Sequence, residues 1–118
     1  MGEKIESYED LNVYQEGYKL VLEVYQITRN LPPEERREIG YQVRRAAVSI
    51  PANIAEGYGR KNSSAEFKHF LRNALGSGNE VIVLLKLIQD LQYGETAAIT
   101  NRYDILGKQI YRLIEVWK

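Results

Sequence analysis

The chain has 118 residues, the size of one domain with a single hydrophobic core. Hydrophobic residues make up 44% and charged residues 27%, as in ordinary globular proteins, and the absence of cysteine excludes disulfides and thiolate metal sites. The first residues lack the basic and apolar regions of a signal peptide, and no apolar run is long enough to cross a bilayer, so we expect a cytoplasmic protein without membrane contact.

The formal net charge is zero, but the charges are unevenly distributed. Residues 36–72 contain eight Lys or Arg and three Asp or Glu, whereas acidic residues predominate elsewhere. This basic middle indicates either a local anion-facing surface or a solvated face with ordinary scatter.

The N-terminal part predicts a short tail followed by an amphipathic helix. Residues 1–9 are polar and unpatterned, and we expect them to be a flexible tail to a single domain of residues 10–118. The first helix should begin near Asp10 and carry two apolar rows, one of Leu11, Tyr14, Tyr18, Val21, Tyr25 and Thr28 and the other of Val13, Leu20, Val24, Ile27 and Leu31. Two apolar rows in a small protein favour self-association, and the alternative is one broad core-facing surface.

Three further helices follow. A second helix is expected at 33–56 with a kink near Ala47 to Pro51, because proline removes one backbone hydrogen bond and crowds the carbonyl of Ala47. Residues 57–62 form a turn with glycine available as a left-handed cap, and Ser63 and Glu66 read as a capping box for the third helix. The fourth helix should start near residue 95 or 96 with an apolar heptad pattern of Ile99, Tyr103, Leu106, Ile110, Leu113 and Trp117. The expected fold class is all-α, an antiparallel up-and-down four-helix bundle.

Two polar rows with the same spacing run along the second and third helices. The first consists of Gln42, Arg45, Ser49, Asn53 and Glu56. The second consists of Glu66, His69, Asn73, Ser77 and Glu80. Because apolar residues flank the first row on both sides, we expect it to be at least partly buried.

The two rows predict a ladder of hydrogen bonds between the second and third helices. Successive pairs, such as Ser49 with Asn73 and Glu56 with Glu66, are equidistant from Lys61 in the turn, so they should lie at equal heights. A satisfied ladder would fix the register of the two helices, and the alternative is that it lines a ligand site. The Glu56–Glu66 pair requires a bridging cation, for which Arg60, Lys61 and His69 are candidates.

The sequence contains few of the residue combinations that are typical of catalytic or metal-binding sites. Glu66 and His69 form a Glu-x-x-His pair of the kind found in di-iron bundles, but such a site needs two pairs and this chain has one histidine. Neither a nucleophile–base constellation nor a phosphate-binding P-loop is present. We therefore expect no enzyme activity, no metal and no cofactor.

The basic middle of the chain supplies candidate contacts to RNA or phosphate. The glycines and cations of the turn, with the free amides that begin the third helix, are suited to an oxyanion, although such turns also occur as plain helix caps. The candidate contact residues are Arg37, Arg44, Gly57, Gly59, Arg60, Lys61, Lys68 and Arg72.

The central segment resembles that of a known protein family. The likeness rests on residues 42–57 (QVRRAAVSIPANIAEG) and continues through Gly59-Arg60, Glu66-Phe67, Phe70-Leu71, Ala74, Gly76-Ser77 and Glu80, with further likeness at residues 11–15 and 31–35. These residues resemble the 23S rRNA intervening-sequence, or S23, family of four-helix bundles.

The resemblance implies a small bacterial bundle that assembles into a ring-like homopentamer. The chain is also similar to accessory proteins of diversity-generating retroelements, which partner a reverse transcriptase and RNA. The expected function is a non-enzymatic homo-oligomer that binds RNA or a ribonucleoprotein through a basic patch on the second and third helices. The alternative is a protein-only scaffold or accessory protein without nucleic-acid binding.

Overall fold

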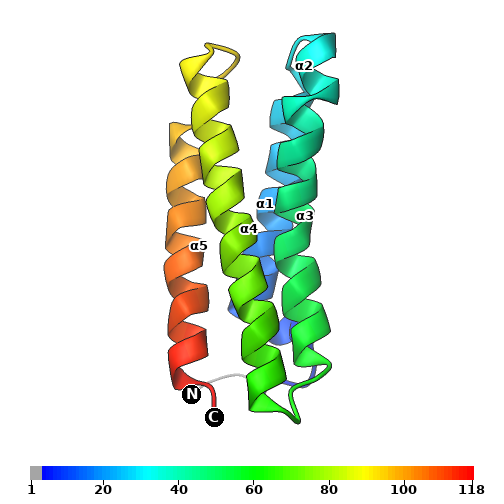
Figure 1. The fold of residues 1–118 in the computed structure, drawn as a ribbon, viewed down its shortest axis with the longest axis vertical. Helices are drawn as coiled ribbons and strands as arrows, with labels where there is room; N and C mark the ends of the chain where they lie inside the picture. Colours follow the sequence, from blue (N-terminus) through cyan, green and yellow to red (C-terminus); the bar gives the residue numbers. More distant parts are fainter. Residues whose placement is uncertain (1–3) are drawn as a thin grey trace.

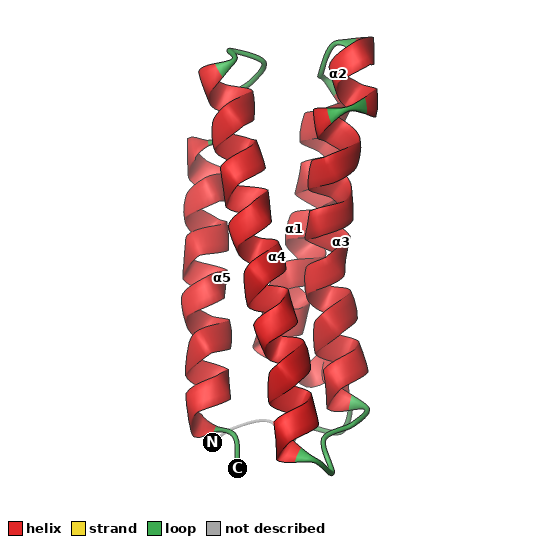
Figure 2. Ribbon diagram, in the orientation of Figure 1, coloured by secondary structure: helices red, strands yellow, loops and turns green. Residues whose placement is uncertain are grey.

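The computed structural model describes residues 4–118 as helices packed side by side along one long axis, in a body of 45 × 26 × 20 Å (Figures 1 and 2). In chain order the elements are a 3-10 helix η1 (Tyr8–Asp10), α1 (Asn12–Arg29), α2 (Pro33–Arg37), α3 (Ile39–Tyr58), α4 (Ser64–Asp90) and α5 (Ala97–Val116). The four long helices alternate in direction, and α3 packs mainly against α1 and α4. The predicted antiparallel four-helix bundle is confirmed.

The core lies between the long helices and is built from the predicted apolar faces. On α5, Ile99, Tyr103, Leu106 and Ile110 are buried as the heptad pattern predicts. The heptad pattern ends at Trp117, which packs edge-on against the buried ring of Phe67 at 4.7 Å between centroids. The largest fully buried side chains are Tyr103, Phe67, Leu20, Leu31, Ile50, Ile54, Leu71, Leu85, Ile88, Leu106, Ile110 and Val24.

The first helix begins slightly later than predicted. Ser7 caps η1, since its hydroxyl accepts from Glu9 N at 3.1 Å and its own amide donates to the Asp10 carboxylate at 3.1 Å. The main helix α1 starts at Asn12 rather than at Asp10. The last residues of the expected tail thus belong to η1, and residues 1–3 lie outside the described part of the chain.

The expected single helix over 33–56 is wrong at its start. The helix is interrupted at Glu38, whose φ of −94° and ψ of −87° separate α2 from α3. By contrast, α3 continues through Pro51. Pro51 is buried against Gly17 of α1, where a Cβ atom would lie 3.6 Å from the proline Cδ. This packing stabilises the helix where one backbone hydrogen bond is missing.

A glutamine, not a glycine, provides the left-handed cap. No described glycine has a positive φ, and Gly59, which follows α3, has a φ of −63°. At the end of α4, Gln92 has a φ of 64°. Its amide donates to Gln89 O at 2.9 Å and the next amide, Tyr93 N, donates to Ile88 O at 3.0 Å, which is the Schellman pattern. The expectation of a left-handed glycine cap after α3 is therefore wrong.

Among the described residues, no helix combines the length and the hydropathy that are needed to cross a membrane.

Candidate functional site

The seam between α3 and α4 holds the two predicted polar rows. Three members are half-buried, namely Ser49 and Asn53 on α3 and Ser77 on α4. The Ser49 and Ser77 hydroxyls lie 2.7 Å apart, and Asn53 Nδ2 donates to Ser49 Oγ at 2.9 Å and to Ser49 O at 2.8 Å. The structure thus brings together a short hydrogen-bonded cluster at mid-height of the seam.

The predicted register of the ladder is wrong by one turn of α4. Ser49 bonds Ser77 and not Asn73, which is exposed. Helical side chains tilt toward the N-terminus of their own helix, so those of α3 tilt away from the turn and those of α4 tilt toward it. A residue of α3 therefore meets a residue of α4 that lies farther along the chain than equal spacing from Lys61 predicts.

Apart from the Glu56–Glu66 rung, the other rungs do not form the expected ladder, and the burial expected of the first row is wrong for Gln42, Arg45 and Glu56. The exposed members of the two rows are Gln42, Arg45, Glu56, Glu66, His69, Asn73 and Glu80. Arg45 donates to the Tyr41 hydroxyl at 3.2 Å, which is the main reason its pKa is raised. The His69 ring packs edge-on against Phe70 at 5.4 Å. These side chains lie on the solvent edge of the seam.

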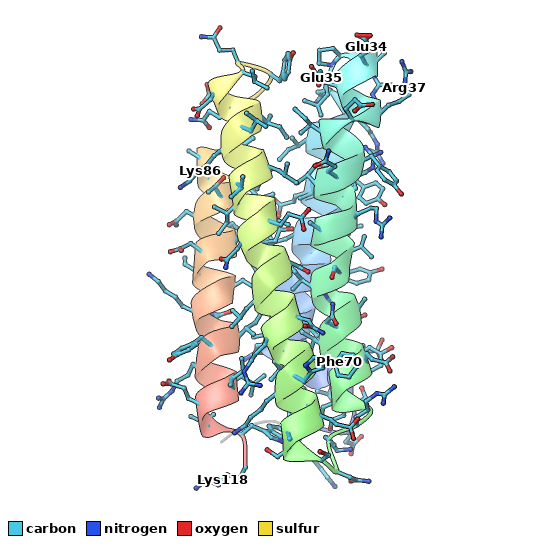
Figure 3. All side chains as sticks on the ribbon, in the orientation of Figure 1. Glu34, Glu35, Arg37, Phe70, Lys86 and Lys118 are labelled. Atoms are coloured by element: carbon cyan, nitrogen blue, oxygen red, sulfur yellow. The ribbon has the colours of Figure 1, made fainter. Side chains whose placement is uncertain are left out.

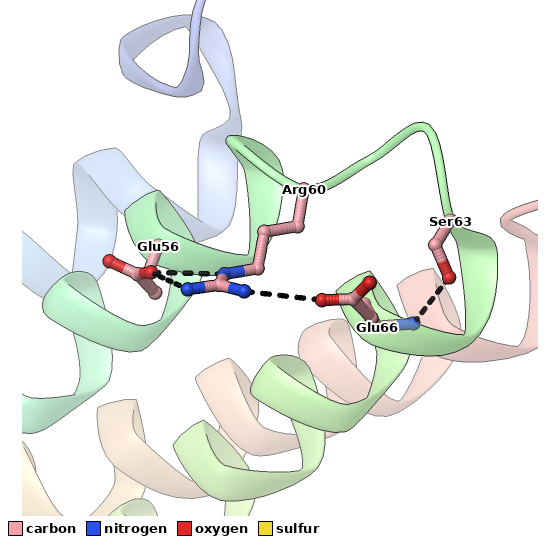
Figure 4. A network of polar contacts seen from close by, with 4 residues as sticks. All are labelled: Glu56, Arg60, Ser63 and Glu66. Atoms are coloured by element: carbon pink, nitrogen blue, oxygen red, sulfur yellow. Dashed lines mark hydrogen bonds and ion pairs between the residues drawn. The ribbon is translucent and has the colours of Figure 1, made fainter.

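Arg60 is the cation that bridges the Glu56–Glu66 rung (Figure 4). Its Nε and Nη2 donate to Glu56 Oε2 at 3.0 and 2.9 Å, and its Nη1 donates to Glu66 Oε1 at 3.3 Å. The hydrogen bonds to Glu56 and then Glu66 raise the pKa of Arg60. The guanidinium also lies 5.3 Å from the Phe70 ring centroid. We call these residues the Arg60 clamp.

The clamp changes the predicted capping box and the predicted phosphate site. Ser63 Oγ accepts from Glu66 N at 3.2 Å, but the Glu66 carboxylate turns to Arg60 instead of returning to the Ser63 amide. Gly57 is a buried residue of α3 and not part of the turn. Lys61 Nζ lies 4.6 Å from the Tyr58 ring centroid, and Gly59 is exposed. Since two carboxylates already occupy Arg60, the geometry gives the turn little capacity to bind an anion.

The remaining candidate RNA contacts are divided between two sides of the bundle. Arg44 is half-buried on the α1 side of α3, with its guanidinium 5.7 Å from the Tyr25 ring centroid. Figure 3 shows Arg37 at the opposite end of the bundle from Phe70. Lys68 and Arg72 lie on the flank of α4 that faces α5, because they precede Leu75 at helical spacing and Leu75 lines a hollow with α5. The basic residues expected to form one patch on the second and third predicted helices, which correspond to α2–α3 and α4, therefore lie on separate surfaces.

The Glu-x-x-His pair does not gather further ligands. In the described part of the chain, no three His, Cys, Asp or Glu side chains lie close enough together to hold a metal ion. Glu66 of this pair is engaged by the Arg60 clamp.

An apolar surface that we call the α1–α3 face remains uncovered. On α1 its exposed members are Tyr18 (52%), Leu22 (56%) and Tyr25 (39%). On α3 they are Tyr41 (50%) and Val48 (42%). Most of these residues, with Val21, Gln26 and Arg29, line one groove. Of the two apolar rows predicted for the first helix, the row of Val13, Leu20, Val24, Ile27 and Leu31 is buried or half-buried, whereas Tyr18 and Tyr25 of the other row are open to solvent.

Three polar contacts between distant residues were not predicted. Arg102 of α5 donates to Glu23 Oε2 at 2.6 Å and to Glu16 Oε2 at 3.2 Å, joining α5 to α1. The sequence did contain a signal for this contact. Arg102 adjoins the core residue Tyr103, and its partners Glu16 and Glu23 are seven residues apart. The Tyr93 hydroxyl donates to Glu35 Oε2 at 3.0 Å.

The third contact is made by Thr96, which is buried between α4 and α5. Its hydroxyl donates to Leu85 O at 2.6 Å, and its amide donates to Gln89 Oε1 at 2.7 Å. A threonine before a helix has no sequence signal that distinguishes this role from an ordinary helix start.

The family model described as 23S rRNA-intervening sequence protein matches residues 9–114, from η1 to the last turn of α5. The chain belongs to this family. The expected likeness to the 23S rRNA-intervening sequence proteins is thereby confirmed, and it covers the α3–α4 seam, the Arg60 clamp and the α1–α3 face. No curated protein gives a significant match to the chain.

Proposed function

We propose that this member of the 23S rRNA-intervening sequence protein family is a non-enzymatic, cytoplasmic bundle that assembles with copies of itself and binds RNA or a ribonucleoprotein. The observation that carries the assembly is the α1–α3 face. Large apolar side chains that stay exposed on a neighbouring pair of helices are typical of an interaction surface. Tyrosine and arginine, which this face combines, are enriched in the centres of protein interfaces.

A homopentameric ring is the assembly that the resemblance supports. Leu22 and Val48 would supply apolar area, and Tyr18 and Tyr25 would add rigid aromatic area with a hydroxyl for hydrogen bonding. The Arg44 guanidinium over Tyr25 places a charge within the same surface.

Light scattering of the purified protein tests the assembly. We expect wild type to be an oligomer and Leu22→Glu to shift it toward the monomer, because a carboxylate cannot be buried in this face without a partner. Val83→Glu on α4 is the matched control, since Val83 is also exposed (63%) but lies outside the α1–α3 face. A monomeric wild type, or equal dissociation of both variants, would contradict the proposal.

RNA is the proposed ligand because the resemblance to accessory proteins that partner a reverse transcriptase and RNA implies an RNA partner, and because the chain keeps exposed cations on α4. The competing function is a scaffold that contacts only protein. A filter-binding titration with structured RNA at several salt concentrations separates the two, since phosphate contacts weaken as salt rises. Absence of binding at low salt would favour the scaffold.

The proposal that the protein is not an enzyme rests on the surroundings of Glu56 and Glu66, the candidate pair of acid–base groups. Glu56 and Glu66 are both exposed and share one guanidinium, so neither has the desolvated setting that tunes a carboxyl group for proton transfer.

A further inference from the structure

A groove runs between α4 and α5, and the buried side chain of Ile50 from α3 also lines it. Two hollows of about 250 and 400 Å³ form it, and they adjoin at Ile82 and Asp104, which line both. On α4 its lining includes Leu75, Asn79, Ile82 and Lys86, which follow helical spacing. On α5 its lining includes Thr100, Asn101, Asp104, Gly107, Lys108 and Tyr111.

Lys86 and Lys108 line this groove, and Lys68 and Arg72 lie beyond its lining on the same flank of α4. Lys86 lies in the hollow toward the α4–α5 loop, and Figure 3 shows it on the α5 side of α4. Lys68 and Arg72 continue the same flank of α4 toward the α3–α4 turn, because positions 68, 72, 75, 79, 82 and 86 alternate steps of four and three. From Lys68 to Lys86 the flank extends about 27 Å at 1.5 Å per residue.

Carboxylates offset this charge only in part. Asp104 lies 3.4 Å from Lys108, and Asp90 lines the far end of the groove. Lys68, Arg72 and Lys86 have no ion-pair partner among the described residues. An anionic chain that lay along the flank would therefore meet three uncompensated cations in succession.

The groove also presents groups that suit bases. The Asn79 and Asn101 side-chain amides line it and carry both donors and acceptors. Thr100 Oγ1 is buried there without a hydrogen-bond partner among the described residues. Tyr111 lines the groove and is 56% exposed, so its ring face is open to stacking.

The width of the groove selects between forms of nucleic acid. Packed helices have axes about 8–10 Å apart, and the groove between two of them is too narrow for a duplex but accommodates an extended single strand. Two other surfaces are less suited, since the Arg60 clamp and the serine cluster fill the α3–α4 seam and the α1–α3 face is proposed for self-association.

We infer that the α4–α5 groove binds single-stranded RNA, with phosphates along Lys68, Arg72 and Lys86 and a base on Tyr111. This inference rests on the proposed RNA function. The sequence-based expectation placed the contact on the second and third predicted helices, which correspond to α2–α3 and α4. The inference places it on α4 and α5 instead.

Fluorescence anisotropy with a labelled single-stranded RNA of about 12 nucleotides tests the groove at several salt concentrations. Lys68→Gln/Arg72→Gln/Lys86→Gln should weaken binding at least tenfold. It should also reduce the slope of log K against log salt by about 2, since each phosphate contact on a single strand contributes about 0.7. The matched control, Arg37→Gln/Arg45→Gln/Lys61→Gln, removes the same charge outside the groove and should change the affinity less than threefold.

Two tyrosine variants distinguish base stacking from general charge. Tyr111→Ala should lose about tenfold in affinity, and Tyr111→Phe, which keeps the aromatic face, should bind like wild type. Light scattering of each variant confirms that the assembly is unchanged.

The results distinguish a wrong groove assignment from a wrong RNA function. If the control triple variant loses affinity and the groove triple variant does not, RNA binding stands and the groove assignment is wrong. If wild type does not bind at low salt, the proposed RNA function itself fails, and the groove assignment fails with it.

Discussion

Gly57 packs against Phe70 so closely that a Cβ atom on Gly57 would lie 2.7 Å from Phe70 Cβ. The same atom would lie 3.0 Å from Phe67 Cδ1 and 3.3 Å from Phe67 O. Because two of these neighbours are fixed to the α4 backbone, the absence of a side chain at Gly57 sets how closely α3 and α4 approach near the turn.

Gly57→Ala should therefore destabilise the protein by about 1–3 kcal/mol, even though alanine is the better helix former. Gly76 of α4 is the matched control, because no atom lies within 4 Å of its Cβ position. Gly76→Ala should stabilise by about 0.5–1 kcal/mol. Urea unfolding at one protomer concentration measures both, and a stabilised Gly57→Ala would contradict the packing argument.

Tyr103→Phe should leave stability unchanged or raise it by about 1 kcal/mol at neutral pH. The Tyr103 hydroxyl is buried and has no hydrogen-bond partner among the described residues, so its removal relieves a desolvation cost. Tyr93→Phe is the control, since it deletes a hydroxyl that bonds Glu35 and should cost about 0.5–1.5 kcal/mol. Equal losses in the two variants would show that Tyr103 has an unseen partner.

The same residue predicts a dependence on alkaline pH. Burial raises the pKa of Tyr103 above its ordinary value of 10.0. The folded state then binds the phenolic proton more tightly than the unfolded state, so stability is fully present below pH 10 and falls as the pH rises above it. Urea unfolding at about pH 8 and pH 11 should show a smaller alkaline loss for Tyr103→Phe than for wild type.

Gln92→Gly should stabilise the end of α4 by about 1 kcal/mol. Gln92 holds the left-handed position of the Schellman cap, which costs a residue with a Cβ atom about 1–2 kcal/mol. Gln92→Ala keeps that strain and should give no comparable gain. Thermal unfolding measures the difference, and an equal effect of both substitutions would exclude backbone strain as the cause.

Arg102→Gln should destabilise the bundle by about 0.5–1 kcal/mol, because Glu16 and Glu23 lose the cation they share. The loss should shrink at high salt, since the side chains are partly exposed and therefore screened. Arg112→Gln is the control, as its pair with Glu115 is longer at 3.7 Å and more exposed. A loss that is independent of salt would point to packing by the Arg102 stem instead.

The helices and the core were predictable because apolar periodicity reports directly on burial. The heptad positions of α5 from Ile99 to Ile110 are buried as expected. The position of the helix break was not predictable in the same way. Pro51 is an intrinsic helix breaker, but its effect is offset by packing on Gly17, whereas Glu38 breaks the helix without any proline or glycine at that position.

The polar seam shows the limit of reasoning from spacing. The repeat of the two polar rows indicated that α3 and α4 would meet there, and Ser49 and Ser77 do meet. Sequence spacing places α-carbons at equal heights, but contacts form between side-chain ends, which are displaced in opposite directions along an antiparallel pair. The cation at Glu56 and Glu66 was anticipated as one of three candidates, and only the geometry identifies Arg60.

The α1–α5 seam has a consequence for how the bundle folds and opens. Helix neighbours in the order α1, α3, α4 and α5 are joined by short connections, so those contacts close small loops, and an up-and-down bundle of this kind is expected to fold within microseconds to milliseconds. Contact between α1 and α5 instead closes a loop that contains nearly the whole chain, so its entropic cost of loop closure is the highest. Amide hydrogen exchange should therefore begin along this seam, where Arg102 joins the first long helix to the last.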